Sequence, residues 1–151
     1  MNLNSFADLA KRLSAMGEDR GPETKAFLET VGEAIEKEAK GEIGHYQRTD
    51  TGPFPEWAEL APSTKRDRVS KGFTENDPLL RTGELRDSIA HEVRGTSVAI
   101  GSDLDIAVYQ EMGTGHIPPR PFLRVAAWRT RKDLGKLYLT RLRERLLGRH
   151  L

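Results

Sequence analysis

The chain has no cysteine among its 151 residues, so disulfide bonds and thiolate metal sites are excluded and the redox compartment stays undetermined. It also has no apolar run near the roughly 18 residues that a membrane-spanning helix requires. Its first residues place Asp8 among apolar positions, which differs from the uninterrupted apolar core of a signal peptide. We therefore expect a soluble intracellular protein with no membrane partner.

Groups of side chains that would build a catalytic or metal site are also lacking. The four histidines are scattered, and none has the spacing of a metal-binding pair. Asp103 and Asp105 stand in a turn, where turn formation is the expected role rather than paired acid–base chemistry. The glycines at 113 and 115 lack the following glycine and lysine of a phosphate-binding loop, and no nucleophile motif occurs. We expect no enzymatic activity, cofactor, metal or small-molecule substrate.

Charge is abundant but unevenly distributed. Charged residues make up 31% of the chain and apolar residues 36%, which is typical of a thin core whose stability is shared with partners. The formal net charge of +1 argues against a generally basic or acidic partner. Residues 120–151 nevertheless hold ten Lys or Arg and two acids, a local charge of +8 that balances an acidic excess earlier in the chain. The length predicts one domain, residues 1–151.

Two amphipathic helices are predicted at the N-terminal end. Apolar residues recur at helical spacing from Phe6 to Met16. A second helix is predicted from Pro22 to about residues 41–44, with an apolar face opposite a face of mixed charge. Both helices are expected to form one layer on a sheet.

Residues 49–78 are rich in proline and glycine, and they predict a long flexible loop with one short helix at about residues 63–71. Trp57 and Phe73 are its expected anchors, because large aromatic side chains in such loops tuck into a core or an interface. The pattern leaves open whether this loop is a tethered surface segment or an interface arm.

The most informative stretch is residues 97–123. It opens with the second strand of a β-hairpin predicted at residues 90–101, and a helix start near Thr82 precedes that hairpin. A short helix is predicted at about residues 107–112, with Gly113 as its left-handed cap. Residues 114–119 combine Gly115 with two prolines, which predicts a stiff exposed arm. Pro121 is then expected to open a long helix that runs to about residue 147.

These elements together predict an α+β fold. It has two N-terminal helices, a small antiparallel sheet centred on a β-hairpin, a long central loop and a long C-terminal helix. A two-stranded hairpin is marginally stable by itself, so we expect a helix against one of its faces.

Several motifs, in this order, resemble those of one protein family. They are W-x-x-L-x-P-S-T at residues 57–64, P-L-L-R-T-G-E-L-R-D-S-I at residues 78–89, a looser A-x-x-Q-E-x-G-T at residues 107–114, and I-P-P-R-P-F-L at residues 117–123. Together they resemble the neck and tail-completion proteins, or virion-morphogenesis proteins, of tailed bacteriophages. The resemblance covers residues 57–123, with a helical region on either side.

This resemblance implies a structural, non-enzymatic subunit that forms a ring, with a hexamer expected, at the head–tail junction of a phage. The partners it implies are the head connector or head-closure ring and the tail-tube or tail-terminator proteins, with genomic DNA passing through the lumen. The protein would be in the host cytoplasm during assembly and in the virion afterwards. The expected interface residues are Trp57, Phe73, Gly113, Thr114, Ile117, Pro118, Pro119 and Arg120.

Two questions stay open at the basic C-terminal end. The arginines there either face DNA or an acidic partner ring, or are only solvated on a charged helix, and a DNA-binding accessory protein is the alternative function. Arg120 either reaches a carboxylate or a helix C-terminus of a neighbouring subunit or caps its own subunit. The expected DNA-facing or partner-facing residues are Arg129, Arg131, Lys132, Arg141 and Arg145.

Overall fold

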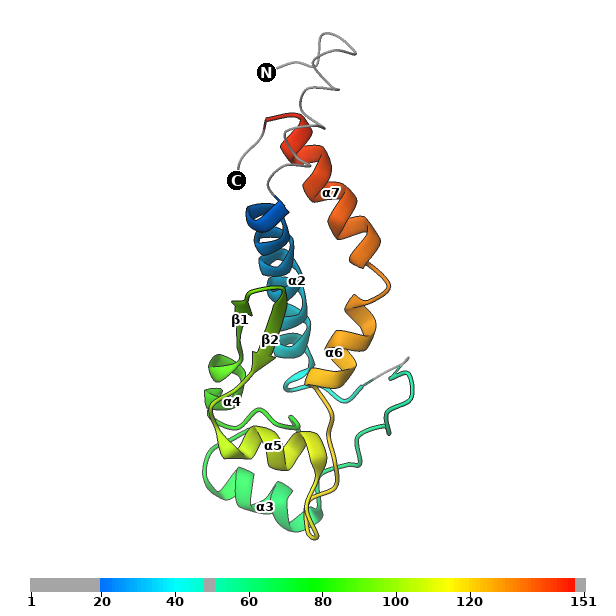
Figure 1. Cartoon of the computed structure of the whole chain (residues 1–151). Helices are drawn as coiled ribbons and strands as arrows, with labels where there is room; N and C mark the ends of the chain where they lie inside the picture. Colours follow the sequence, from blue (N-terminus) through cyan, green and yellow to red (C-terminus); the bar gives the residue numbers. More distant parts are fainter. Residues whose placement is uncertain (1–19, 48–50, 149–151) are drawn as a thin grey trace, which may run out of the picture.

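Helix α2 (Arg20–Glu42) is the central element of the computed structural model, which describes residues 20–47 and 51–148 (Figure 1). The helix expected at residues 6–16 lies outside these ranges. Pro22 and Glu23 stand in the first turn of α2, where a missing N–H is harmless and a carboxylate complements the helix dipole. Gly44, with φ of 97°, follows the last turn, so the helix predicted from Pro22 is confirmed.

The predicted hairpin is confirmed and packs on one face of α2. Strands β1 (Ala90–Arg94) and β2 (Ser97–Gly101) pair antiparallel, with Val93 opposite Val98, and form a two-stranded sheet in the described part of the chain. A Cβ atom at Gly32 of α2 would collide with the His91 ring, so the glycine permits this close approach. The helix therefore supplies the support that an isolated hairpin lacks.

Two helices, α6 (Leu123–Thr130) and α7 (Leu134–Leu146), run along the other side of α2 (Figure 1). The prediction of one continuous helix from Pro121 to about residue 147 is wrong, because residues 131–133 form a turn. Here the Asp133 N–H donates to the Thr130 carbonyl, three residues back, as in a tighter helix. The charged residues of this turn are exposed, so no burial against α2 keeps the helix straight.

Three short helices lie near the C-terminal end of α2. They are α3 (Pro62–Ser70), α4 (Glu84–Ser88) and α5 (Asp105–Met112), and α3 matches the short helix predicted inside the central loop. The cap of α4 is Gly83, with φ of 92°, rather than Thr82, whose hydroxyl accepts only a long 3.4 Å bond from the Glu84 N–H. The loop after α3 is held by Arg68, a buried side chain that donates to the carbonyls of Thr74 and Leu80.

The core lies where α2, α4, α5 and α6 converge. Its fully buried members include Phe122 and Ala126 from the α6 region, Ala39 from α2 and Ile89 after α4. Within residues 20–47 and 51–148, no helix has the length and apolar character to cross a membrane. The architecture is the predicted α+β class.

Candidate functional site

Residues 113–119 form an exposed loop between α5 and α6, which we call the arm. The loop is closed by its own hydrogen bonds: the Thr114 N–H donates to the Ile117 carbonyl at 2.8 Å, and the Thr114 hydroxyl accepts from the Ile117 N–H at 3.1 Å. Gly113 has φ of 77°, and a Cβ there would lie 2.9 Å from the backbone nitrogen of Pro119. The arm predicted at residues 114–119 is exposed, as expected, and hydrogen bonds within the chain set its shape.

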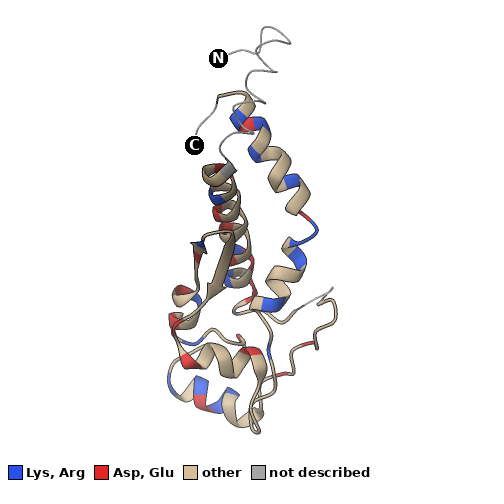
Figure 2. Cartoon of the chain, in the orientation of Figure 1, with Lys and Arg blue, Asp and Glu red and all other residues tan. Residues whose placement is uncertain are grey.

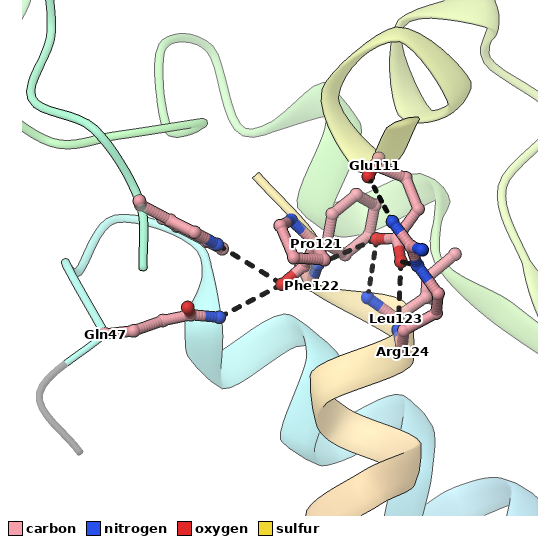
Figure 3. Close-up of polar contacts among 7 residues, drawn as sticks. Gln47, Glu111, Pro121, Phe122, Leu123 and Arg124 are labelled. Atoms are coloured by element: carbon pink, nitrogen blue, oxygen red, sulfur yellow. Dashed lines mark hydrogen bonds and ion pairs between the residues drawn. The ribbon is translucent and has the colours of Figure 1, made fainter. Parts of the chain in front are cut away.

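A buried carboxylate fixes the second end of the arm. Glu111, in the last turn of α5, accepts hydrogen bonds from the backbone N–H groups of Phe122, Leu123 and Arg124 at 2.7, 2.9 and 3.1 Å (Figure 3). The Arg124 guanidinium adds a bond to Glu111 at 2.8 Å. A carboxylate at a helix N-terminus satisfies N–H groups that have no partner inside the helix, and it complements the helix dipole. Glu111 thus joins the end of α5 to the start of α6.

The backbone at the base of the arm is held from two further directions. The Arg120 N–H donates to the Gln110 carbonyl at 2.6 Å. The Pro121 carbonyl accepts from the Trp57 indole at 3.2 Å and from the Gln47 amide at 3.0 Å, and Figure 3 shows the bond from Gln47. Contacts from the central loop and from the segment after α2 therefore meet at one peptide group, which holds the base of the arm.

The Arg120 side chain makes its hydrogen bonds within its own chain. Its side chain is buried, with 5% exposed, and one terminal nitrogen donates to the Ala58 carbonyl at 2.9 Å and to the Glu59 carbonyl at 3.4 Å. Its Nε has no hydrogen-bond partner, and no carboxylate in the described part of the chain pairs with the guanidinium. Burial therefore lowers the pKa of Arg120 below its ordinary value, because the charged form is desolvated. Of the two roles expected for Arg120, these contacts match the one in which it caps its own subunit.

A groove of about 550 Å³ lies beside the arm, bounded by α3, the start of α4 and α5. Arg120 and Gln110 line it, and each has one buried polar atom without a partner, Nε and Oε1 respectively. Its size is in the range of ordinary binding pockets. Its apolar walls come mainly from Leu60, Ala61, Leu85, Ile106, Ile117 and Pro118.

Helix α5 also carries exposed apolar side chains next to this groove, and we call this surface the α5 face. Four apolar residues out of eight in a short helix are exposed, which is an arrangement typical of a protein–protein contact. Since the arm follows directly from this helix, the α5 face and the arm form one continuous candidate interface. The α5 face consists of Ile106, Val108, Tyr109 and Met112, with 40, 59, 46 and 63% exposed.

The expected interface residues divide into two groups. Gly113, Thr114, Ile117, Pro118 and Pro119 lie together on the arm, with the two prolines exposed. Trp57 is 6% exposed and belongs to the core, and Phe73 is half-buried under the Arg81 guanidinium, 5.0 Å from the ring centre. The two aromatic side chains thus hold the central loop to its own subunit.

Two of the five residues expected to face DNA or a partner pair with α2 instead. Arg129 pairs with Glu38 and Glu42 of α2, and Arg145 pairs with Glu23 of the same helix at 2.6 Å. These two side chains therefore stabilise the packing of α6 and α7. The other three lie elsewhere: Arg131 is exposed and stacks on the Trp128 ring at 3.4 Å, Lys132 is exposed, and Arg141 is 3.8 Å from Glu144.

Reasoning from the sequence did not assign Glu111 a role, although the residue belongs to the Q-E-x-G-T motif. The sequence signal for its role is a lone acid just before the glycine that ends one helix. The next helix starts after a proline, and its first N–H groups need an acceptor. In the part of the chain that the structure describes, no group of three or more His, Asp or Glu side chains could hold a metal ion.

Comparison with known protein families matches residues 1–135 to the phage virion morphogenesis family. No curated protein and no solved structure matches this chain. The matched region contains α2, the hairpin, the α5 face, the arm and the whole of α6.

Proposed function

This chain belongs to the phage virion morphogenesis family, and we propose that it acts as a ring-forming subunit at the head–tail junction. Family membership makes it a virion-associated protein with a structural or assembly role. In the proposed ring, with a hexamer as the expected form, the subunit joins the head connector or head-closure ring to the tail-tube or tail-terminator proteins.

The observation that supports this proposal is the α5 face beside a preformed arm. A loop already held by Glu111, Gln110 and its own hydrogen bonds loses little conformational entropy when it docks. The exposed apolar residues of α5 supply the burial that a stable contact requires. We infer that this surface binds the neighbouring ring of the junction.

The proposal is tested by supplying the chain in trans to cells infected with a phage that lacks it. Without the chain we expect separate heads and tails in electron micrographs, and with it joined particles. The variant Val108→Lys places a charge on the α5 face and should reduce joined particles about tenfold, which corresponds to roughly 1.4 kcal/mol of lost contact. The matched control is Val69→Lys on α3, because both valines are similarly exposed, 59% and 56%.

Two outcomes would contradict the proposal. Normal numbers of joined particles without the chain would exclude the head–tail role. Equal effects of Val108→Lys and Val69→Lys would show that the α5 face is not the docking surface.

A further inference from the structure

The charges of this chain are separated onto two sides of the molecule. Residues 82–105, which include α4 and the hairpin, carry five acids and two arginines, and we call this region the acidic side. Residues 123–148, which form α6 and α7, carry eight Lys or Arg and two acids, and we call this region the basic side. Figure 2 shows the blue positions concentrated along α6 and α7 and red positions on α4 and at the start of α5.

Helix α2 lies between the two sides. His91 of the hairpin bonds to Glu29 and Glu36, whereas Arg129 of α6 and Arg145 of α7 pair with Glu42 and Glu23. With 3.6 residues per turn, positions 29 and 36 fall on one face of α2, whereas positions 23 and 42 each lie roughly 130° around the helix from that face, on its other half. The acidic and basic sides therefore point away from each other.

Charges remain available on the outer surface of both sides. Glu84, Asp103 and Asp105 are exposed, and none pairs with a basic side chain in the described part of the chain. Arg131 and Arg143 are exposed on the basic side, and neither pairs with a carboxylate there. Each side thus has unneutralised charge that a partner of opposite sign would complement.

We propose that the acidic side of one copy binds the basic side of the next copy, head to tail. This inference rests on the proposed ring and assigns the two surfaces that close it. Like charges disfavour a two-fold dimer through either side, whereas opposite charges favour a heterologous contact, which is the kind that generates rings. The α5 face and the arm are then left for neighbouring proteins of the junction.

Charge reversal tests this arrangement in purified full-length chains at low salt, where exposed charges are least screened. One variant, Asp103→Lys with Asp105→Lys, makes the acidic side basic. A second variant, Arg131→Glu with Arg143→Glu, weakens or inverts the basic side. We expect each variant alone to require about tenfold more protein to assemble than wild type, as measured by light scattering. An equal mixture of the two should recover assembly, because their altered sides are again complementary.

The controls place single charge reversals outside both sides. Lys37→Glu on α2 and Glu56→Lys on the central loop alter exposed residues, and both should assemble like wild type. Thermal melting of each monomer shows whether a variant has lost its fold rather than its contact.

Each result decides the inference. Recovery in the mixture supports it, whereas reversal variants that assemble like wild type, a mixture that does not recover, or a wild-type chain that stays monomeric at low salt all overturn it. In these cases the head–tail function stands if joined particles still depend on the chain in infected cells. If joining does not depend on the chain, the function proposed above fails, whichever surfaces form the contact.

Discussion

Helices α6 and α7 are neighbours in sequence, both are basic and both pack along α2, yet they are held in different ways. Helix α6 buries Val125, Ala126 and Thr130, and its first turn is bonded to Glu111, whereas α7 buries none of its residues. The contacts of α7 with α2 include the Arg145–Glu23 ion pair and a T-shaped contact between Tyr138 and Phe27, with ring centres 5.4 Å apart. Burial and buried hydrogen bonds therefore fix α6, the half of the basic side that supports the arm, while a partly exposed ion pair and an aromatic contact hold α7.

The largest expected difference between the two helices comes from deleting an apolar side chain in each. Phe122 is fully buried at the start of α6, and Phe122→Ala should lower the free energy of unfolding by about 3–5 kcal/mol. Leu139 of α7 is 63% exposed, and Leu139→Ala should change it by less than about 0.5 kcal/mol. Denaturant unfolding of both variants measures this contrast. Similar losses would show that α7 is as firmly packed as α6.

The next expected effect concerns the carboxylate that joins α5 to α6. Glu111→Ala leaves three backbone N–H groups and the Arg124 Nε without their acceptor, which should cost about 3 kcal/mol of unfolding free energy. Glu111→Gln keeps one acceptor oxygen and should lose roughly half as much. Backbone hydrogen exchange at residues 122–124 should accelerate in Glu111→Ala. Unchanged exchange there would mean that Glu111 does not hold the start of α6.

Elements set by local patterns could be predicted from the sequence, whereas contacts between segments could not. The second helix and the hairpin follow from local periodicity and turn residues, and both were predicted with nearly the observed bounds. The bonds that Glu111 accepts from residues 122–124 have only a weak local signal, the acid before the glycine cap. The bond that Arg120 donates to the Ala58 carbonyl joins segments 62 residues apart, and no local pattern encodes it. The break between α6 and α7 was missed because apolar residues recur on both sides of it, so the two helices look like one.

Arg120 should show a smaller effect than Glu111, because it lies in the firmly held half but makes fewer bonds. Arg120→Ala removes the donor that serves the carbonyls of Ala58 and Glu59, and we expect a loss of about 2 kcal/mol in the free energy of unfolding. Arg120→Lys keeps the charge without the planar fork and should recover part of that loss. A monomer whose stability is unchanged in Arg120→Ala would instead favour a role for Arg120 at a neighbouring subunit.

A pH-dependent contact between α2 and the hairpin should change the free energy of unfolding by less than Arg120→Ala does and by more than a change at the end of α7. Hydrogen bonds to Glu36 and then Glu29 raise the pKa of His91, while Lys40 and His91 lower the pKa of Glu36. The His91 contribution is therefore fully present below its unfolded pKa of about 6.5 and is lost as pH rises through its raised folded value. The Glu36 contribution is present above the unfolded pKa of Glu36, about 4.3, and is lost as pH falls through its lowered folded value.

The measurement is the difference in unfolding free energy between wild type and His91→Gln as a function of pH. We expect about 1 kcal/mol near pH 6, where both groups are charged, and a decline toward alkaline pH. A chemical-shift titration of the His91 ring in the folded protein gives its pKa directly. A midpoint below about 6.5 would contradict the expected direction.

The last effect is also small, and it is expected at the C-terminal end of α7. It tests whether α7 is held less firmly than α6. The Arg145–Glu23 pair has side chains that are 29% and 21% exposed, so water and salt still reach it and screen it in part. Arg145→Ala should therefore lower the free energy of unfolding by no more than about 0.5 kcal/mol at physiological salt, and by more at low salt. Arg145→Lys keeps the charge, so its free energy of unfolding should lie between those of Arg145→Ala and wild type. Chemical denaturation at two salt concentrations measures both variants, and a salt-independent loss of about 2 kcal/mol would mean that α7 is anchored as firmly as α6. A small, salt-dependent loss would instead show that α7 is the part of the basic side most easily shifted, which is where a neighbouring copy could adjust it without disturbing the arm.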